Sequence, residues 1–118
     1  MNTRIAYLYR DGANNKRLAE PVLAGVLTPQ QIRDIQHVCD EETFFIASQV
    51  GLPDLQTQWA ANGYAFPTDN DHVWSELQAI TNTEDAPTRA LTADAFYTAM
   101  IATATWDISG AMERLGIA

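Results

Sequence analysis

The side chains best suited to chemistry are His72 and Glu76, beyond the middle of the chain. They are four residues apart, so they share one face whether the segment forms a helix or a strand. This spacing permits a general acid–base pair. A solvent-exposed histidine beside acidic residues is the commoner arrangement, and the sequence contains no glycine-rich phosphate loop, serine-nucleophile elbow or zinc-protease motif. We therefore expect no catalytic residue, and an enzyme using His72 and Glu76 is only a second alternative.

The other residues of metal-ligand type, His37 and Cys39, are poorly spaced for a shared metal ion. On a helix, residues two apart point about 200° away from each other. A zinc site would need His72 and carboxylates to complete its ligands, and the adjacent acidic run 40–42 does not stabilise a Cys39 thiolate. We expect no metal and no cofactor, with Cys39 packed as a small apolar residue.

A loop rich in hydrogen-bond donors follows the first apolar run. Residues 10–17 combine turn-forming residues with cations in a chain otherwise poor in cations. Gly12, Asn14 and Asn15 tolerate positive φ and can turn backbone amides towards one point, while arginine and lysine bind carboxylate or phosphate. Two interpretations stay open: an anion-binding corner, or a hairpin loop whose arginine and aspartate pair with each other or with neighbours. The predicted binding residues are Arg10, Asp11, Asn14, Lys16 and Arg17.

The charge of the chain is strongly acidic and unevenly distributed. Its 7 Lys and Arg against 15 Asp and Glu give a net charge of −8 at pH 7, which argues against direct binding of nucleic acid or of an anionic membrane. Residues 1–17 carry four cations and one carboxylate, whereas residues 18–118 carry three cations and all the other carboxylates. We expect opposed basic and acidic surfaces, suited to a cationic protein partner or to self-association. The predicted acidic patch comprises Asp40, Glu41, Glu42, Asp69 and Asp71.

The length and composition fit a single domain, residues 1–118. A chain of 118 residues with 47% hydrophobic residues buries enough apolar surface to fold without a disulfide or a metal. Cys39 is the only cysteine, so an internal disulfide is excluded and a reducing, cytoplasmic location is expected. Neither the N-terminal run nor the uncharged stretch 55–68 is apolar enough for a signal peptide or a membrane-spanning helix.

Hydrophobic periodicity predicts the elements that must position these residues. Residues 4–10 carry apolar side chains on both faces, which is typical of a central strand. The run 21–27 predicts a second strand, able to pair with the first as an antiparallel hairpin. Residues 28–31, Thr-Pro-Gln-Gln, form a capping-box pattern that begins a helix ending near Asp40. Its buried stripe comprises Ile32, Ile35, Val38 and Cys39.

The middle of the chain has weaker patterns. Residues 43–46 predict either a short strand or an extended segment that fills the core. Residues 52–60 predict a helical turn that stops at Asn62-Gly63. Residues 73–81 match both helical and strand spacing, so periodicity alone leaves this element open.

The C-terminal part predicts one long helix. Thr92 is placed to cap it, and apolar residues at helical spacing continue to Leu115, with Ser109-Gly110 as a point of bending. Taken together, the elements predict an α+β domain. Its expected architecture is a small antiparallel sheet of three to four strands with two to three helices packed on one face.

The start of the chain resembles a family of proteins. Residues 7–16 read Tyr-Leu-Tyr-Arg-Asp-Gly-Ala-Asn-Asn-Lys, which is similar to the Tyr-Leu-Tyr-Arg-Asp-x-x-Asn-x-Lys start of an uncharacterised family of small bacterial proteins. The likeness extends through most of the chain, including residues 49–55 and 71–77. It implies a bacterial or phage origin and a strand over 73–81, without an established activity. In that family a second histidine often stands at the position of Ser75, so a metal or acid–base role is in doubt here.

These observations lead to one expected function and two alternatives. The charge asymmetry and the aromatic residues in polar surroundings favour a non-enzymatic, intracellular protein-binding module. The first alternative is an acidic inhibitor of a nucleic-acid-handling enzyme, such as an anti-defence, anti-CRISPR-like or immunity protein from a mobile element. The second is the small enzyme centred on His72 and Glu76.

Overall fold

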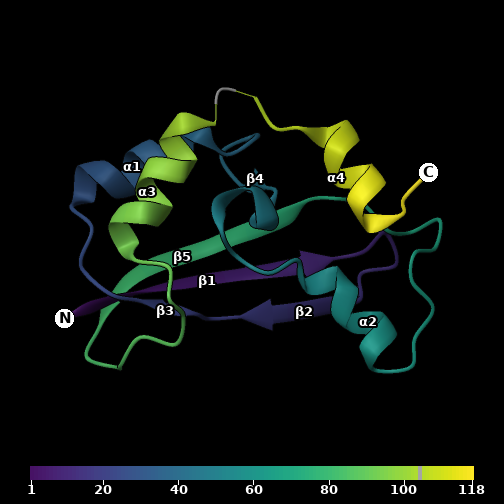
Figure 1. Cartoon of the computed structure of the whole chain (residues 1–118), viewed down its shortest axis with the longest axis horizontal. Helices are drawn as coiled ribbons and strands as arrows, with labels where there is room; N and C mark the ends of the chain where they lie inside the picture. Colours follow the sequence, from purple (N-terminus) through teal and green to yellow (C-terminus); the bar gives the residue numbers. More distant parts are fainter. Residues whose placement is uncertain (104) are drawn as a thin grey trace.

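Five strands form one antiparallel sheet in the computed structural model, which describes residues 1–103 and 105–118. They are β1 (Asn2–Arg10), β2 (Lys16–Ala19), β3 (Val22–Leu23), β4 (Phe44–Phe45) and β5 (Ser75–Thr83). The strand β1 is the axis: β5 pairs with one of its edges, β2 and β3 pair with the other, and β4 extends the sheet beyond β5 (Figure 1). The predicted central strand over residues 4–10 is confirmed.

The core lies against one face of β1. Alternate residues along a strand point to the same side, and Ile5, Tyr7 and Tyr9 have no exposed surface. Phe45 of β4 packs against Tyr7 with ring centroids 5.5 Å apart in an edge-on arrangement. Helical side chains complete this cluster, so the central strand is covered by elements from both halves of the chain.

The helix α1 (Pro29–Val38) begins as the capping-box pattern predicts. The Thr28 hydroxyl accepts a hydrogen bond from the Gln31 backbone N–H at 3.1 Å, and the Gln31 side-chain oxygen accepts one from the Thr28 N–H at 2.9 Å. These bonds satisfy two amides that the helix itself leaves unpaired. The predicted stripe is also confirmed, because Ile35 and Cys39 are buried and their apolar neighbours pack against the same core.

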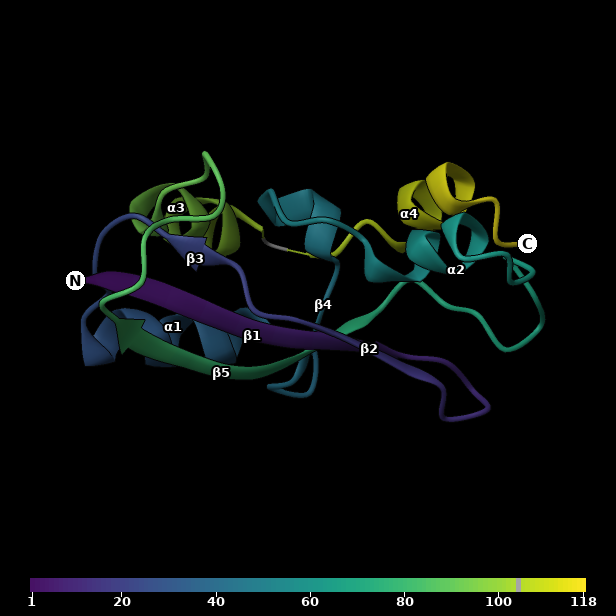
Figure 2. The ribbon, with the colours of Figure 1, turned by 90° about the horizontal axis from the view of Figure 1, so that it is seen from below.

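Three further α-helices and two short 3₁₀ turns complete the described chain. They are η1 (Ala47–Val50), η2 (Leu55–Thr57), α2 (Gln58–Ala61), α3 (Ala93–Ala102) and α4 (Ile108–Leu115). Figure 2 shows α2, α3 and α4 on the same side of the sheet, whereas α1 lies at the level of the strands, behind β5. The expected α+β class is therefore confirmed, with one helix beside the sheet instead of over it.

The expected single C-terminal helix is wrong, because two helices occupy this region. The helix α3 ends at Ala102, and α4 starts after Asp107, whose carboxylate accepts a hydrogen bond from the Gly110 N–H at 2.9 Å. A Cβ at Gly110 would collide with the Asp107 carboxylate. The glycine thus permits the cap of a new helix and does not bend an old one.

The first hairpin also differs from the prediction. Lys16 and Arg17 belong to β2, where they pair with Arg10 and Tyr9 of β1, so the connecting loop is shorter than expected. Within the predicted strand 21–27 only β3 forms. Proline at its start has no N–H to donate to a strand ladder, and Gly25, with a φ of 98°, turns the chain away after Ala24.

The open alternatives in the middle of the chain are now decided. Residues 43–46 contain the short strand β4, and residues 75–83 form a strand and not a helix. The helical turn over 52–60 is represented by η2 and α2, and Gly63 follows with a φ of 86° as the expected left-handed stop.

Candidate functional site

The loop between β1 and β2 folds around its own carboxylate. Asp11 Oδ1 accepts hydrogen bonds from the backbone N–H groups of Ala13 at 2.9 Å and Asn15 at 2.8 Å, and Oδ2 accepts one from the Asn15 side-chain amide at 3.0 Å. Asn14 takes a φ of 66°, a left-handed conformation that asparagine tolerates. The amides of this loop, which the sequence analysis considered as donors to an external anion, therefore donate to the Asp11 carboxylate.

These bonds set the charge of Asp11. Burial alone raises the pKa of this carboxyl group, but the hydrogen bonds from Asn15 and Ala13 outweigh that effect and hold the pKa below its usual value. Asp11 is thus an anion at neutral pH, held in one orientation by the loop. The loop presents a carboxylate where the anion-binding interpretation required a cationic corner.

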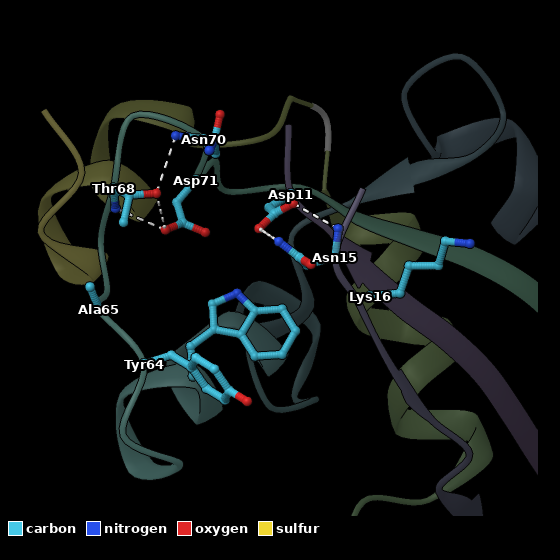
Figure 3. A pocket seen from close by; sticks show the side chains of 9 residues that line it. Asp11, Asn15, Lys16, Tyr64, Ala65, Thr68, Asn70 and Asp71 are labelled. Carbon is cyan, nitrogen blue, oxygen red and sulfur yellow. Dashed lines mark hydrogen bonds between the residues drawn. The ribbon is translucent and has the colours of Figure 1, made fainter. Parts of the chain in front are cut away.

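The cations of the loop are largely engaged within the chain. Arg10 Nε donates to Glu76 of β5 at 3.0 Å and Nη1 donates to Asn14 at 2.7 Å, so the hairpin interpretation describes this residue. The guanidinium of Arg17 donates to the side chain of Gln58. Lys16 is exposed, and Figure 3 shows its side chain extending away from Asp11.

The facing wall is the segment that leads from α2 into β5. Asp71 is only 9% exposed. Its Oδ1 accepts a hydrogen bond from the Tyr9 hydroxyl at 2.6 Å, and its Oδ2 accepts bonds from the N–H and hydroxyl of Thr68 at 2.9 and 3.2 Å. Burial raises the pKa of Tyr9, and the hydrogen bond to Asp71 raises it further. Asp71 is therefore a fixed wall residue, which corrects its expected place in an open acidic patch.

One backbone contact joins the two walls. The Gly12 N–H donates to the Asn70 carbonyl at 2.8 Å. A Cβ at Gly12 would lie 3.3 Å from the Asn70 side-chain oxygen and 3.4 Å from its carbonyl oxygen, closer than most real contacts. Glycine therefore allows the loop and the segment to approach each other.

Between these walls lies a pocket of about 440 Å³. Figure 3 shows Asp11 and Asp71 on one side of it and Tyr64 on the other. Tyr64 is 69% exposed, whereas Trp59 of α2 packs partly on the core with its ring 6.1 Å from that of Tyr9. The pocket is lined by Asp11, Asn15, Lys16, Trp59, Tyr64, Ala65, Thr68, Asn70 and Asp71.

The aromatic side of the pocket was missed by the sequence analysis, although a signal was present. The uncharged stretch 55–68 places the large aromatic side chains of Trp59 and Tyr64 among polar residues. The predicted residues Asp11 and Lys16 do line the pocket. Arg10, Asn14 and Arg17 do not line it, and Arg10 and Arg17 are bonded to other residues of the chain.

His72 is held by both ring nitrogens. Nδ1 accepts a hydrogen bond from the Trp74 N–H at 3.0 Å, which leaves the proton of the neutral ring on Nε2, 2.7 Å from the Arg10 carbonyl oxygen. Glu76 forms an ion pair with Arg10. In this arrangement the candidate acid–base residues join the segment 72–76 to β1, and neither faces the pocket.

Two of the remaining predicted acidic residues, Asp40 and Glu41, line a different hollow. Asp40, Glu41 and Glu42 are exposed in the turn before β4, and Glu41 and Glu42 have positive φ values of 51° and 59°. A shallow groove of about 280 Å³ beside this turn is lined by Asp40, Glu41, Phe44, His72 and Trp74. Glu42 and the exposed Asp69 are not among the lining residues of either hollow.

The charges of the two chain segments mix in the fold. Arg4 and Arg10 from the basic N-terminal part form ion pairs with Asp85 and Glu76 from the acidic part.

Cys39 is buried, and burial raises the pKa of its thiol to about 12. Among the described residues, no three His, Cys, Asp or Glu side chains are grouped to hold a metal ion.

No helix within residues 1–103 and 105–118 has the length and apolar character needed to cross a membrane. Compared with known proteins, the chain matches no family model, no curated protein and no solved structure.

Proposed function

We propose that this protein is a non-enzymatic, intracellular binding module that recognises a cationic segment of a partner protein. The pocket between the β1–β2 loop and the segment 64–71 receives a basic side chain of that partner. Its carboxylates, Asp11 and Asp71, supply the negative charge, and the rings of Trp59 and Tyr64 supply the apolar contact.

The observation that carries this proposal is the pairing of two oriented carboxylates with two aromatic rings around one hollow. A guanidinium or ammonium group is attracted both by carboxylate oxygens and by the face of an aromatic ring. The cation of the pocket wall, Lys16, extends away from Asp11 and does not neutralise it (Figure 3). A net charge of −8 attracts basic partners over a longer range.

The alternatives have less support. An enzyme would need a free base, and the ring nitrogens of His72 are both occupied by backbone groups while Glu76 pairs with Arg10. Imitation of a nucleic acid relies on a continuous row of carboxylates, and three of the predicted acidic residues are divided between two hollows, with Asp71 in the pocket and Asp40 and Glu41 in the groove. A reduced intracellular setting agrees with the buried Cys39 thiol.

A titration of the full chain with a designed peptide tests the proposal. The probe is a short, acetylated and amidated glycine–serine peptide with one central arginine, and its match is the same peptide with neutral citrulline. We expect the arginine peptide to shift the NMR signal of the Trp59 indole N–H, with affinity falling as salt is added. Tyr64→Ala and Asp11→Asn should each weaken binding about tenfold, the effect of losing about 1.4 kcal/mol.

Asp69→Asn is the matched control, because it removes the same charge beside the pocket but not in its lining. It should leave the affinity nearly unchanged. Equal binding of the citrulline peptide, or an equal loss from Asp69→Asn and Asp11→Asn, would show that the pocket does not recognise a cation.

A further inference from the structure

The shallow groove repeats the chemistry of the pocket. It combines the carboxylates of Asp40 and Glu41 with the aromatic rings of Phe44 and Trp74. Within the described chain, no hydrogen bond reaches the Asp40 or Glu41 carboxylate oxygens, and both residues are exposed. The groove therefore presents a second pair of acidic groups next to aromatic surface.

The two hollows lie on either side of one short segment. Asp71 lines the pocket and the next residue, His72, lines the groove. The ring of Tyr9 lies 6.1 Å from the Trp59 ring in the pocket and 5.0 Å from the His72 ring in the groove. The Trp59 and His72 rings are thus no more than about 11 Å apart, the rise of roughly three extended residues.

We propose that the pocket and the groove bind one extended segment of the partner through two basic side chains, two or four positions apart. This inference rests on the proposed function, since it assigns the first basic side chain to the pocket. An extended chain rises about 3.3 Å per residue and turns alternate side chains to the same side. Side chains two or four positions apart are therefore separated by about 7 or 13 Å and point to the same side of the segment.

Peptides of equal charge test the spacing. Each is an acetylated and amidated glycine–serine peptide with two arginines, which are adjacent in one peptide and two or four positions apart in the others. Adjacent arginines point to opposite sides of an extended chain. We expect a peptide with spaced arginines to bind the full chain about tenfold more tightly than the adjacent pair or a single arginine, because the second contact becomes intramolecular.

The tryptophan signals report each hollow separately. The spaced peptide should shift the indole N–H signals of both Trp59 and Trp74, whereas the single-arginine peptide at low saturation should shift that of Trp59 first. Glu41→Gln should reduce the affinity of the spaced peptide towards that of the single arginine and leave the single-arginine affinity unchanged. Glu42→Gln is the matched control, because Glu42 faces His37 at 3.5 Å and does not line the groove.

The outcomes separate this inference from the proposed function. Equal affinity for spaced and adjacent arginines, or a Trp74 signal that stays still while that of Trp59 moves, would overturn two-point binding and leave the pocket intact. A Trp59 signal that responds to no arginine peptide would overturn both. An equal effect of Glu41→Gln and Glu42→Gln would show that only the overall charge matters.

Discussion

Tyr7 and Tyr9 stand two residues apart on the buried face of β1 and belong to one core cluster, but their hydroxyl groups reach different surroundings. We call the apolar surroundings of Tyr7 the core end and the pocket wall at Tyr9 the pocket end. The Tyr7 hydroxyl donates to the Pro53 backbone carbonyl at 2.7 Å, within the apolar core next to Phe45. The Tyr9 hydroxyl donates to the Asp71 carboxylate at 2.6 Å. Burial raises the pKa of both hydroxyl groups.

The difference shows how one residue type serves two purposes. At the core end, a neutral backbone acceptor closes the hydrogen bond, and apolar packing provides the stability. At the pocket end, the buried hydroxyl orients a carboxylate at the wall of an open hollow. Apolar packing should therefore be the main source of stability at the core end, whereas at the pocket end the hydrogen bond to the Asp71 carboxylate should matter most, both for stability and for the orientation that ligand binding needs.

The largest expected effect is at the core end. Phe96 of α3 has no exposed surface and packs in the cluster around β1. Phe96→Ala removes these contacts and leaves a cavity, so the free energy of unfolding should fall by about 4 kcal/mol. Urea denaturation followed by circular dichroism measures this loss. A loss under about 1 kcal/mol would mean that this end is not the main source of stability.

A direct comparison of the two tyrosines comes next. Tyr9→Phe removes the hydrogen bond to the Asp71 carboxylate and the acceptor of the His72 N–H, and it should lower the free energy of unfolding by about 2 kcal/mol. Tyr7→Phe removes one to a neutral carbonyl and should cost about 1 kcal/mol. Urea denaturation of both variants gives the two values side by side. If Tyr7→Phe lowers the free energy of unfolding as much as Tyr9→Phe does, the two hydrogen bonds are equally strong and the proposed difference between the core end and the pocket end is wrong.

The cap of α1 tests local structure at the core end. Thr28→Ala removes the acceptor for the Gln31 N–H, and we expect a loss of about 1 kcal/mol in thermal or urea unfolding. Thr28→Ser keeps a hydroxyl and serves as the control. An unchanged stability in Thr28→Ala would show that water satisfies this amide equally well.

A smaller effect is expected from Asp11 in acid. Its pKa is lower in the folded chain than its ordinary value of 3.8, so its contribution is fully present above that value and is lost as the pH falls through the lowered one. Solvent screens this carboxylate, which limits the contribution to about 0.5 kcal/mol. Urea denaturation at decreasing pH should show the stability difference between wild type and Asp11→Asn becoming smaller. A difference that grows in acid would reverse the expected sign.

The smallest effect on stability is expected at the rim of the pocket. Tyr64 is the most exposed large aromatic residue, so Tyr64→Ala should change the free energy of unfolding by less than about 0.5 kcal/mol. The same variant is expected to weaken peptide binding. Calorimetric melting measures the first property and NMR titration the second. A large loss of stability in Tyr64→Ala would show that Tyr64 belongs to the core, and the proposed separation between residues for stability and residues for binding would be wrong.

The sequence alone predicted the elements whose causes are local. The hydroxyl of Thr28 and the amide of Gln31 are three residues apart, so their reciprocal bonds follow from the order of residues. The strand β1 and the buried stripe with Ile35 and Cys39 follow from periodicity. These features need only the direction of side chains along a helix or a strand.

The break between α3 and α4 escaped prediction for a related reason. Apolar residues continue at helical spacing through it, so periodicity carries no sign of the interruption. The break depends instead on Asp107, whose carboxylate caps a second helix and needs the free space at Gly110. The glycine was interpreted as a kink, although Asp107 and Gly110 are three residues apart and their capping contact is a local signal that the sequence already contained.

The sequence by itself determined the α+β class, the central strand, the first helix and the acidic charge, because periodicity, capping and composition are properties of neighbouring residues. Only the tertiary structure decided the pocket. It arises where the Gly12 N–H meets the Asn70 carbonyl and where Asp71 meets Tyr9, contacts between residues far apart in the chain. The structure also decides between the two interpretations left open for the β1–β2 loop, because its amides donate to the neighbouring Asp11 carboxylate and not to an external anion.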